Sequence, residues 1–263
     1  MEAPERHDAM RHRKIARLVW ALLSSFVVES LVFGLAALPA VLFWEWHFDW
    51  RITPDWLRIL ILSMSFIPAY VLFAISLMVF SATAMRLTGW RTRDRLDEPI
   101  FAMGWPALDW MRYMVSIHLV KIFAGSVFRT TPVWTAYVRW NGGRLGRRVF
   151  INSLGVTDHN LLEFGDDVVL GGDVHLSGHT IEGGRLKTGR VRFGDRVTVG
   201  VGAVVGIDVA AGDGCQIGAL SLVPKHSTLE AGTTYAGIPV RAIRSSGSSE
   251  KESNQGGVAR SSP

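Results

Sequence analysis

The apolar residues of the first third of the chain form two long runs. Run 18–44 contains one charged residue, Glu29, and run 59–85 contains none. About 20 consecutive apolar residues are enough to cross the hydrocarbon core of a bilayer. The pattern therefore predicts a transmembrane hairpin over 17–86, with spans at about 18–44 and 59–85. Because a carboxylate inside a span is costly, we expect protein to cover the helix face that carries Glu29.

Basic residues flank the two runs on their outer sides. Four precede the first run and four follow the second: Arg11, Arg13, Lys14 and Arg17, then Arg86, Arg91, Arg93 and Arg95. Positive charge is enriched on the cytoplasmic side of membrane helices. We therefore predict a multi-pass protein of the inner membrane, with a basic cytoplasmic N-terminus at 1–16 and both termini in the cytoplasm. Attraction to anionic headgroups also accounts for the net charge of +5 without a nucleic-acid partner.

Aromatic and basic residues alternate after the second run. The segment 87–142 carries Trp105, Trp110, Trp134, Tyr137 and Trp140 among several arginines. Such a mixture is typical of amphipathic helices at a membrane surface. It also fits a helix that caps the open end of a repeat domain. We predict interfacial amphipathic helices over 87–142, and the two placements are compatible.

A six-residue period dominates the last third of the chain. Eight blocks begin with an apolar or aromatic residue, and glycine follows the first five: Phe193, Val199, Val205, Ala211, Ile217, Val223, Leu229 and Tyr235. Five such glycines would arise by chance on the order of once in a million placements. The period predicts a parallel β-helix of hexapeptide coils, with glycine where the chain turns.

Earlier blocks extend the β-helix towards the N-terminus. They begin at Phe164, Leu170 and Leu176, with weaker ones at Leu145 and Ile151, so we place the β-helix at 143–244. The Ser/Gly-rich segment 245–263 is predicted to be a disordered tail. The single cysteine, Cys215, excludes an internal disulfide and is expected to be a small buried residue.

Two irregularities interrupt the period, and each carries a polar candidate. A one-residue excess falls within 157–163 and contains Asp158. The stretch 182–192 has no register and is predicted to be a loop outside the β-helix, with His179 at its mouth. Loops of this kind often carry function. A histidine suits proton abstraction from a hydroxyl or amine near neutral pH, although a surface histidine in a turn is the plainer interpretation.

Zinc chemistry is a second possibility for these histidines. His159, His175 and His179 match in number the three zinc ligands of the gamma carbonic anhydrases, which are also β-helix proteins. Their spacing differs from that family's pattern, so we expect no metal. We expect His175 to be a structural strand residue and His226 an exposed corner residue.

The chain end carries a family resemblance. Residues 235–244, Y-A-G-I-P-V-R-A-I-R, with F-G-D at 193–195 and I-G-A-L-S-L-V-P-K at 217–225, resemble the closing coils of hexapeptide-repeat acetyltransferases. The resemblance implies a left-handed β-helix, often a homotrimer with active sites between subunits, and acetyl-CoA or another acyl-CoA as donor. It matches His179 to the catalytic histidine and Asp158 to an acceptor-binding aspartate. It matches four positions to donor contacts: Ala219, Lys225, Arg241 and Arg244.

The same segments depart from the sugar acetyltransferases and resemble another group. Thr198 stands where many of them have tryptophan, so we do not expect a simple sugar acceptor. T-T-P-V-W-T-A-Y-V-R at 130–139 and T-D-H-N-L-L-E-F-G-D at 157–166 resemble the membrane-embedded β-helix module of nonribosomal-peptide-synthetase-like proteins, such as the epsilon-poly-lysine synthetases. That resemblance implies a carrier-protein thioester as a further possible donor.

Together these patterns predict a membrane-anchored acyltransferase with His179 as general base. It would transfer an acyl group from CoA or a carrier-protein thioester to a hydroxyl or amine at the inner leaflet. The expected partners are the lipid bilayer, a second and third copy of the chain, and a carrier protein or synthetase. The alternative is a non-catalytic membrane module that assembles a synthetase-like complex.

Overall fold

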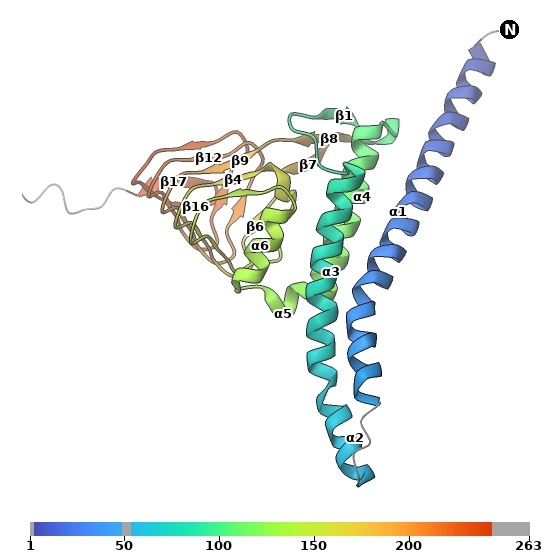
Figure 1. The fold of residues 1–263 in the computed structure, drawn as a ribbon. Coiled ribbons are helices and arrows are strands. Elements are labelled where there is room, and N and C mark those ends of the chain that lie inside the picture. The colour runs from blue at the N-terminus through green and yellow to red at the C-terminus, as the bar shows by residue number, and fades with distance from the viewer. Residues whose placement is uncertain (1–2, 49–53, 244–263) are drawn as a thin grey trace, which may run out of the picture.

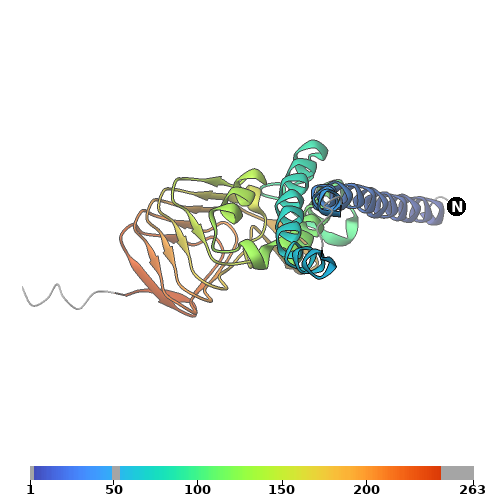
Figure 2. The same ribbon diagram turned by 60° about the horizontal axis from the view of Figure 1, so that its bottom comes forward.

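A bundle of long helices lies against one end of a β-helix (Figure 1). The computed structural model describes residues 3–48 and 54–243. Arg244 and the predicted tail at 245–263 lie outside the described residues. Figure 2 shows the coils stacked away from the helices, so that the C-terminal strands lie at the far end of the stack.

The two apolar runs form the helical hairpin that their pattern predicts. They comprise α1 (Ala3–Phe48), α2 (Asp55–Met64) and α3 (Phe66–Thr88), and α1 packs along α3. The second run breaks at Ser65 because the ring of Pro68 would clash with the carbonyl of Met64 in a continuous helix. Glu29 is only 8% exposed and lies beside Ser116, which confirms that protein covers this helix face.

Three helical stretches are long and apolar enough to cross a membrane by length and composition. They are Met10–Trp46, Asp55–Thr88 and Trp105–Phe128. The third was not among the predicted spans. Half of its most apolar window is buried inside the protein, compared with about a fifth for the first two.

The aromatic segment folds into helices that pack on the hairpin and, in the case of α6, on the β-helix. α4 (Trp105–Val120) continues through a π-helical turn, η2 (Lys121–Gly125), into α5 (Ser126–Phe128), and α6 (Pro132–Trp140) follows. In α6, Trp134 and Tyr137 are buried against the first coil. The capping placement is therefore confirmed for α6.

The β-helix has three faces of short parallel strands. One face contains β2 (Arg144–Leu145), β4 (Leu162–Phe164), β9 (Val191–Phe193), β12 (Ala210–Ala211) and β15 (Thr228–Leu229). The second contains β3 (Phe150–Ile151), β5 (Val169–Leu170), β10 (Thr198–Val199), β13 (Gln216–Ile217) and β16 (Thr234–Gly237), closed by the antiparallel β17 (Val240–Ile243). The third contains β6 (His175–Leu176), β11 (Val204–Val205) and β14 (Leu222–Val223).

The register of these strands confirms the six-residue period. Phe164, Phe193, Ala211 and Leu229 align on one face, and each is at most 5% exposed. Three blocks make one turn of the β-helix, so every third block-starting residue stacks on the same face. Cys215 is buried and unpaired, as predicted.

The reason for the repeating glycines differs from the prediction. They do not supply left-handed turn conformations, which fall instead on residues such as Arg196, Gly202 and Asp208. A Cβ on Gly200 would lie 2.4 Å from the backbone nitrogen of Ala219 in the next coil. Glycine is therefore required by the close approach of successive coils rather than by the turn itself.

The predicted irregular loop is an ordered hairpin that begins earlier than predicted. β7 (His179–Glu182) and β8 (Arg185–Thr188) pair antiparallel, and β1 (Asp97–Pro99) adds a third strand beside β8. Gly183 and Gly184 form the turn, and both have positive φ angles, 55° and 70°. Two consecutive residues with positive φ are what a type I′ hairpin turn requires.

Candidate active site

The two irregularities of the repeat meet in space. Asp158 immediately precedes the 3₁₀-helix η3 (His159–Leu161), in a left-handed conformation with φ 49° and ψ 49°. His179 is the first residue of β7. The Nδ1 atom of His179 lies 2.5 Å from Oδ2 of Asp158. The structure thus joins the two predicted catalytic residues by a direct hydrogen bond.

Asp158 is held by several donors. It is fully buried and accepts hydrogen bonds from Oγ1 of Thr92 at 2.6 Å, Oγ1 of Thr157 at 3.1 Å, and the backbone N–H of Gly178 at 3.1 Å. Burial alone would raise the pKa of Asp158. The hydrogen bond and the electrostatic interaction with His179, together with the Thr92 and Thr157 hydroxyls, outweigh burial and lower that pKa below its ordinary value.

This arrangement selects the tautomer of the neutral His179 ring. An ionised carboxylate only accepts hydrogen bonds, so Nδ1 carries the proton and Nε2 presents its lone pair. Among the described residues, none makes a hydrogen bond to Nε2. The ring of Trp110, from α4, lies edge-on at 4.9 Å from the imidazole, whose side chain stays 22% exposed. The dyad therefore leaves Nε2 without a hydrogen-bond partner among the described residues, on a partly exposed side chain beside an aromatic wall.

Two of these contacts were not predicted. Thr92 lies in the linker between α3 and β1 and is separated from Asp158 by 66 positions. Trp110 was noted only as part of an aromatic segment. No local pattern marks either residue, because both depend on how α4 and the linker lie against the β-helix.

His159 is a core residue. It is fully buried, its ring lies edge-on to Trp134 and Tyr137, and neither ring nitrogen has a hydrogen-bond partner. Burial, reinforced by the charge of Lys121, lowers the pKa of His159 to about 3. His175, in contrast, is exposed on β6. Within 3–48 and 54–243, no group of three or more His, Cys, Asp or Glu side chains could hold a metal ion.

The residues matched to donor contacts are placed differently from one another. Lys225 follows β14, and its ammonium group binds the carboxylate of Glu182 in β7, so it lies beside the hairpin that carries His179. Ala219 is exposed in the turn between β13 and β14, and Arg241 is exposed on β17. Neither contacts His179. His226 is exposed near Asp208, at 3.1 Å, as expected for a corner residue.

Known proteins with similar sequences include acetyltransferases. No family model matches the chain. A serine acetyltransferase of Helicobacter pylori is 36% identical over 104 residues, which are 39% of this chain and 57% of that enzyme. The chain is therefore similar to serine acetyltransferases, which are hexapeptide-repeat acyltransferases. This confirms the resemblance carried by residues 193–244, although the chain spans only about half the length of the serine acetyltransferases that it matches.

Two further similarities are to a synthetase and to a solved acetyltransferase. A delta-poly-L-ornithine synthetase of Acinetobacter baumannii is 24% identical over 111 residues, which are 42% of this chain and 8% of the synthetase. A galactoside acetyltransferase solved in complex with coenzyme A is 28% identical, with a TM-score of 0.32, over 38% of this chain and 53% of that chain. The similarity to a synthetase-like protein is therefore confirmed as a distant and partial one.

Proposed function

We propose that the chain transfers an acyl group from a thioester donor to a hydroxyl or amine acceptor, with His179 as general base. The observation that supports this most directly is the 2.5 Å hydrogen bond between Nδ1 of His179 and the buried carboxylate of Asp158. It leaves Nε2 as the proton acceptor. A positioned histidine of this kind contributes about 10²–10⁴-fold to proton-transfer steps.

The proposed reaction proceeds in two steps. The acceptor oxygen or nitrogen attacks the thioester carbonyl carbon while Nε2 of His179 takes its proton. The tetrahedral intermediate then breaks its C–S bond, and the leaving sulfur takes that proton from the imidazolium and departs as a thiol. Asp158 remains a carboxylate throughout and stabilises the imidazolium. Because the N–H of Gly178 already binds Asp158, other backbone amides of the corner would stabilise the oxyanion.

In this proposal the acyl donor is an acyl-CoA or an acyl group that a carrier protein holds as a thioester. In the family resemblance, Ala219, Lys225, Arg241 and Arg244 match CoA contacts, and basic side chains suit CoA phosphates. Lys225 lies at the hairpin of His179, where a phosphate would compete with the carboxylate of Glu182. The similarity to the poly-ornithine synthetase supports a carrier-protein thioester as the other donor. A left-handed winding and a homotrimer are part of this proposal.

The acceptor is held at the inner leaflet. The wall beside His179 is Trp110 of α4, and α4 belongs to a stretch apolar enough to enter a membrane. A shallow apolar depression of about 290 Å³ runs along α4 from Trp110 past Met114 and His118 to Ile122. This surface supports an acceptor with an apolar part. In this proposal, spans 18–44 and 59–85 cross the inner membrane and both termini and the β-helix are cytoplasmic.

A thermal-shift titration tests the donor. Detergent-purified full chain would be titrated with CoA, acetyl-CoA and an acyl-carrier thioester, because a ligand that binds the native state raises its stability by about 2.7 kcal/mol at 100 times its Kd. We expect a shift with at least one of them and a smaller CoA shift in Lys225→Ala. The matched control is Lys187→Ala on β8. A folded protein that responds to none of the three would contradict the proposal and favour the non-catalytic, complex-assembling module.

A further inference from the structure

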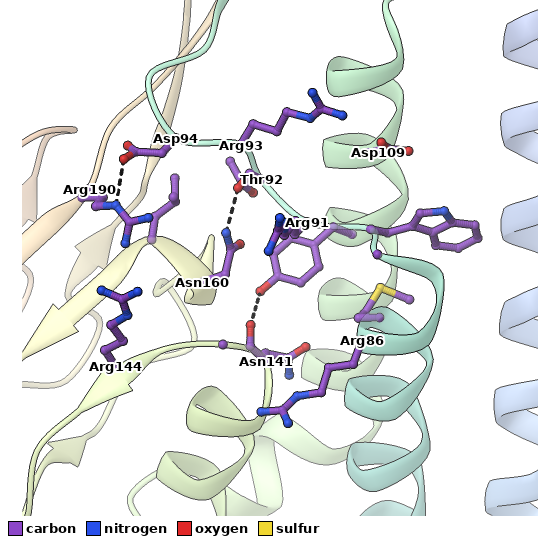
Figure 3. Close-up of a pocket in the computed structure, with 16 residues that line it drawn as sticks. Arg86, Arg91, Thr92, Arg93, Asp94, Asp109, Asn141, Arg144, Asn160 and Arg190 are labelled. Carbon is purple, nitrogen blue, oxygen red and sulfur yellow. Dashed lines mark hydrogen bonds and ion pairs between the residues drawn. The ribbon is translucent and has the colours of Figure 1, made fainter.

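A polar pocket, whose lining does not include His179, lies beside the helices. It has a volume of about 790 Å³ and opens between the end of α3, α4 and the first coils of the β-helix (Figure 3). Five arginines line it, against the two carboxylates of Asp94 and Asp109: Arg86, Arg91, Arg93, Arg144 and Arg190. We call it the arginine pocket. Its net positive charge distinguishes it from the apolar depression along α4.

The guanidinium groups of two of the five arginines have no hydrogen-bond partner among the described residues. Arg190 binds Asp94 at 2.7 Å, Arg144 binds Glu163 at 3.1 Å, and Arg86 donates to a backbone carbonyl. The guanidinium groups of Arg91 and Arg93 make no hydrogen bond or ion pair with any residue that the structure describes, although the charge of Arg93 acts on Asp109 across the pocket. Both are exposed and line the pocket, so their charge is available to a ligand.

The pocket wall also holds two unpartnered acceptors. Nδ2 of Asn141 donates to the carbonyl of Tyr137 at 3.2 Å, and Nδ2 of Asn160 donates to the carbonyl of Thr92 at 2.7 Å. These bonds fix the orientation of both amides. Each Oδ1 atom is then buried without a donor, and the whole of Asn141 is only 5% exposed. Buried acceptors of this kind are destabilising unless a hydroxyl or amine group reaches them.

We propose that the arginine pocket binds a phosphate ester whose alcohol part carries hydroxyl or amine groups. Guanidinium groups pair with phosphate oxygens in a bidentate manner, and the asparagine oxygens would accept from the alcohol part. Arg86 and Gly89 stand where the second apolar run ends, so an anionic lipid headgroup is one source of such a group. A soluble phosphate ester is the other source.

One residue of the pocket wall contacts the dyad. Thr92, which lines the pocket, is 1% exposed and donates to Oδ1 of Asp158. A ligand in the pocket would therefore contact the linker between α3 and β1, whose Thr92 hydrogen-bonds Asp158. The proposal itself concerns binding and does not depend on acyl transfer.

The test uses the full chain in a neutral detergent and reads thermal stability. The probes are short-chain phosphatidylglycerol, glycerol 3-phosphate, and short-chain phosphatidylcholine as the zwitterionic control. Arg91→Gln and Arg93→Gln are compared with Arg95→Gln, which removes the same charge from an exposed neighbour outside the pocket. We expect Arg91→Gln and Arg93→Gln each to raise the Kd about tenfold, because the loss of one hydrogen bond to a charged group weakens binding by roughly that factor.

The outcomes separate the sources and can refute the site. A shift with phosphatidylglycerol alone identifies a lipid headgroup, and a shift with glycerol 3-phosphate alone identifies a soluble ester. A shift with both shows that the pocket accepts either source, and all three results support the pocket. The proposal is overturned if neither anionic probe shifts the wild-type protein more than phosphatidylcholine does. It is equally overturned if Arg91→Gln and Arg93→Gln bind like Arg95→Gln. Because no turnover is measured, these results stand whatever the outcome for acyl transfer.

Discussion

Burial of His159 makes the first coil sensitive to acid. The pKa of this side chain is about 3 in the folded protein and 6.5 in the unfolded chain, because burial disfavours its charged form. Below pH 6.5 the unfolded chain binds a proton that the folded chain does not take up until about pH 3. The resulting stability is thus complete above pH 6.5 and is lost as the pH falls from 6.5 towards 3.

The size of this effect follows from the two pKa values. Each unit of difference corresponds to about 1.36 kcal/mol, so the complete loss is roughly 5 kcal/mol. At pH 5 the unfolded state gains about 2 kcal/mol relative to pH 7.5 from this one group. Replacing His159 with leucine removes the titrating group and leaves no ring nitrogen without a partner. Between pH 7.5 and pH 5, we therefore expect the free energy of unfolding to fall by about 2 kcal/mol less in His159→Leu than in the wild type.

The assay is denaturant unfolding of detergent-purified protein at pH 7.5 and 5.0, followed by tryptophan fluorescence. Groups that do not interact with His159 contribute equally in both proteins, so the difference between the two losses reports on residue 159 and its immediate neighbours Lys121 and Asp158. His175→Gln is the matched control, because His175 is exposed in the next coil of the same domain. It should retain the wild-type pH dependence. Equal losses in wild type and His159→Leu would refute the reasoning.

Three further predictions follow from individual contacts. Asp158→Asn should lower turnover about 10²–10⁴-fold and destabilise the fold by roughly 3–5 kcal/mol, since the carboxylate binds buried donors. Turnover and thermal unfolding measure these two effects. Turnover equal to that of the wild type would contradict the prediction. Lys225→Ala should raise KM for acetyl-CoA about tenfold at unchanged kcat, whereas Glu182→Gln should lower this KM by freeing Lys225. Equal KM values in both variants would exclude a donor role for Lys225. Gly200→Ala should destabilise the protein by about 1–3 kcal/mol through its clash with the next coil, while Gly172→Ala, whose new Cβ meets nothing closer than 3.7 Å, should stay within about 0.5 kcal/mol in the same unfolding assay.

The sequence predicts the regular part of this fold well because each coil repeats the same physical constraint. Inward residues such as Val199 and Ile217 are buried where the period places them. The hairpin was predicted only as a loop, although the pair Gly183–Gly184 is a recognised signal for a tight turn. The helix break at Ser65 is also readable in retrospect from Pro68.

The site could be predicted only in part. Asp158 and His179 were found because both interrupt the repeat, and the structure joins them. Thr92 and Trp110 come from segments outside the β-helix, and no periodicity relates them to it. Their contribution is set by tertiary packing of the linker and α4, which a single sequence does not reveal.

The central claim is that Nε2 of His179 takes the proton of the acceptor. The most direct measurement is transfer of a labelled acyl group from acetyl-CoA or a carrier thioester to membrane extract by the reconstituted protein. His179→Ala is compared with His175→Ala, which removes an exposed histidine four positions earlier. The account predicts that His179→Ala remains folded and loses at least about 10²-fold in transfer, while His175→Ala transfers like the wild type. Transfer by folded His179→Ala within about twofold of the wild type would contradict it.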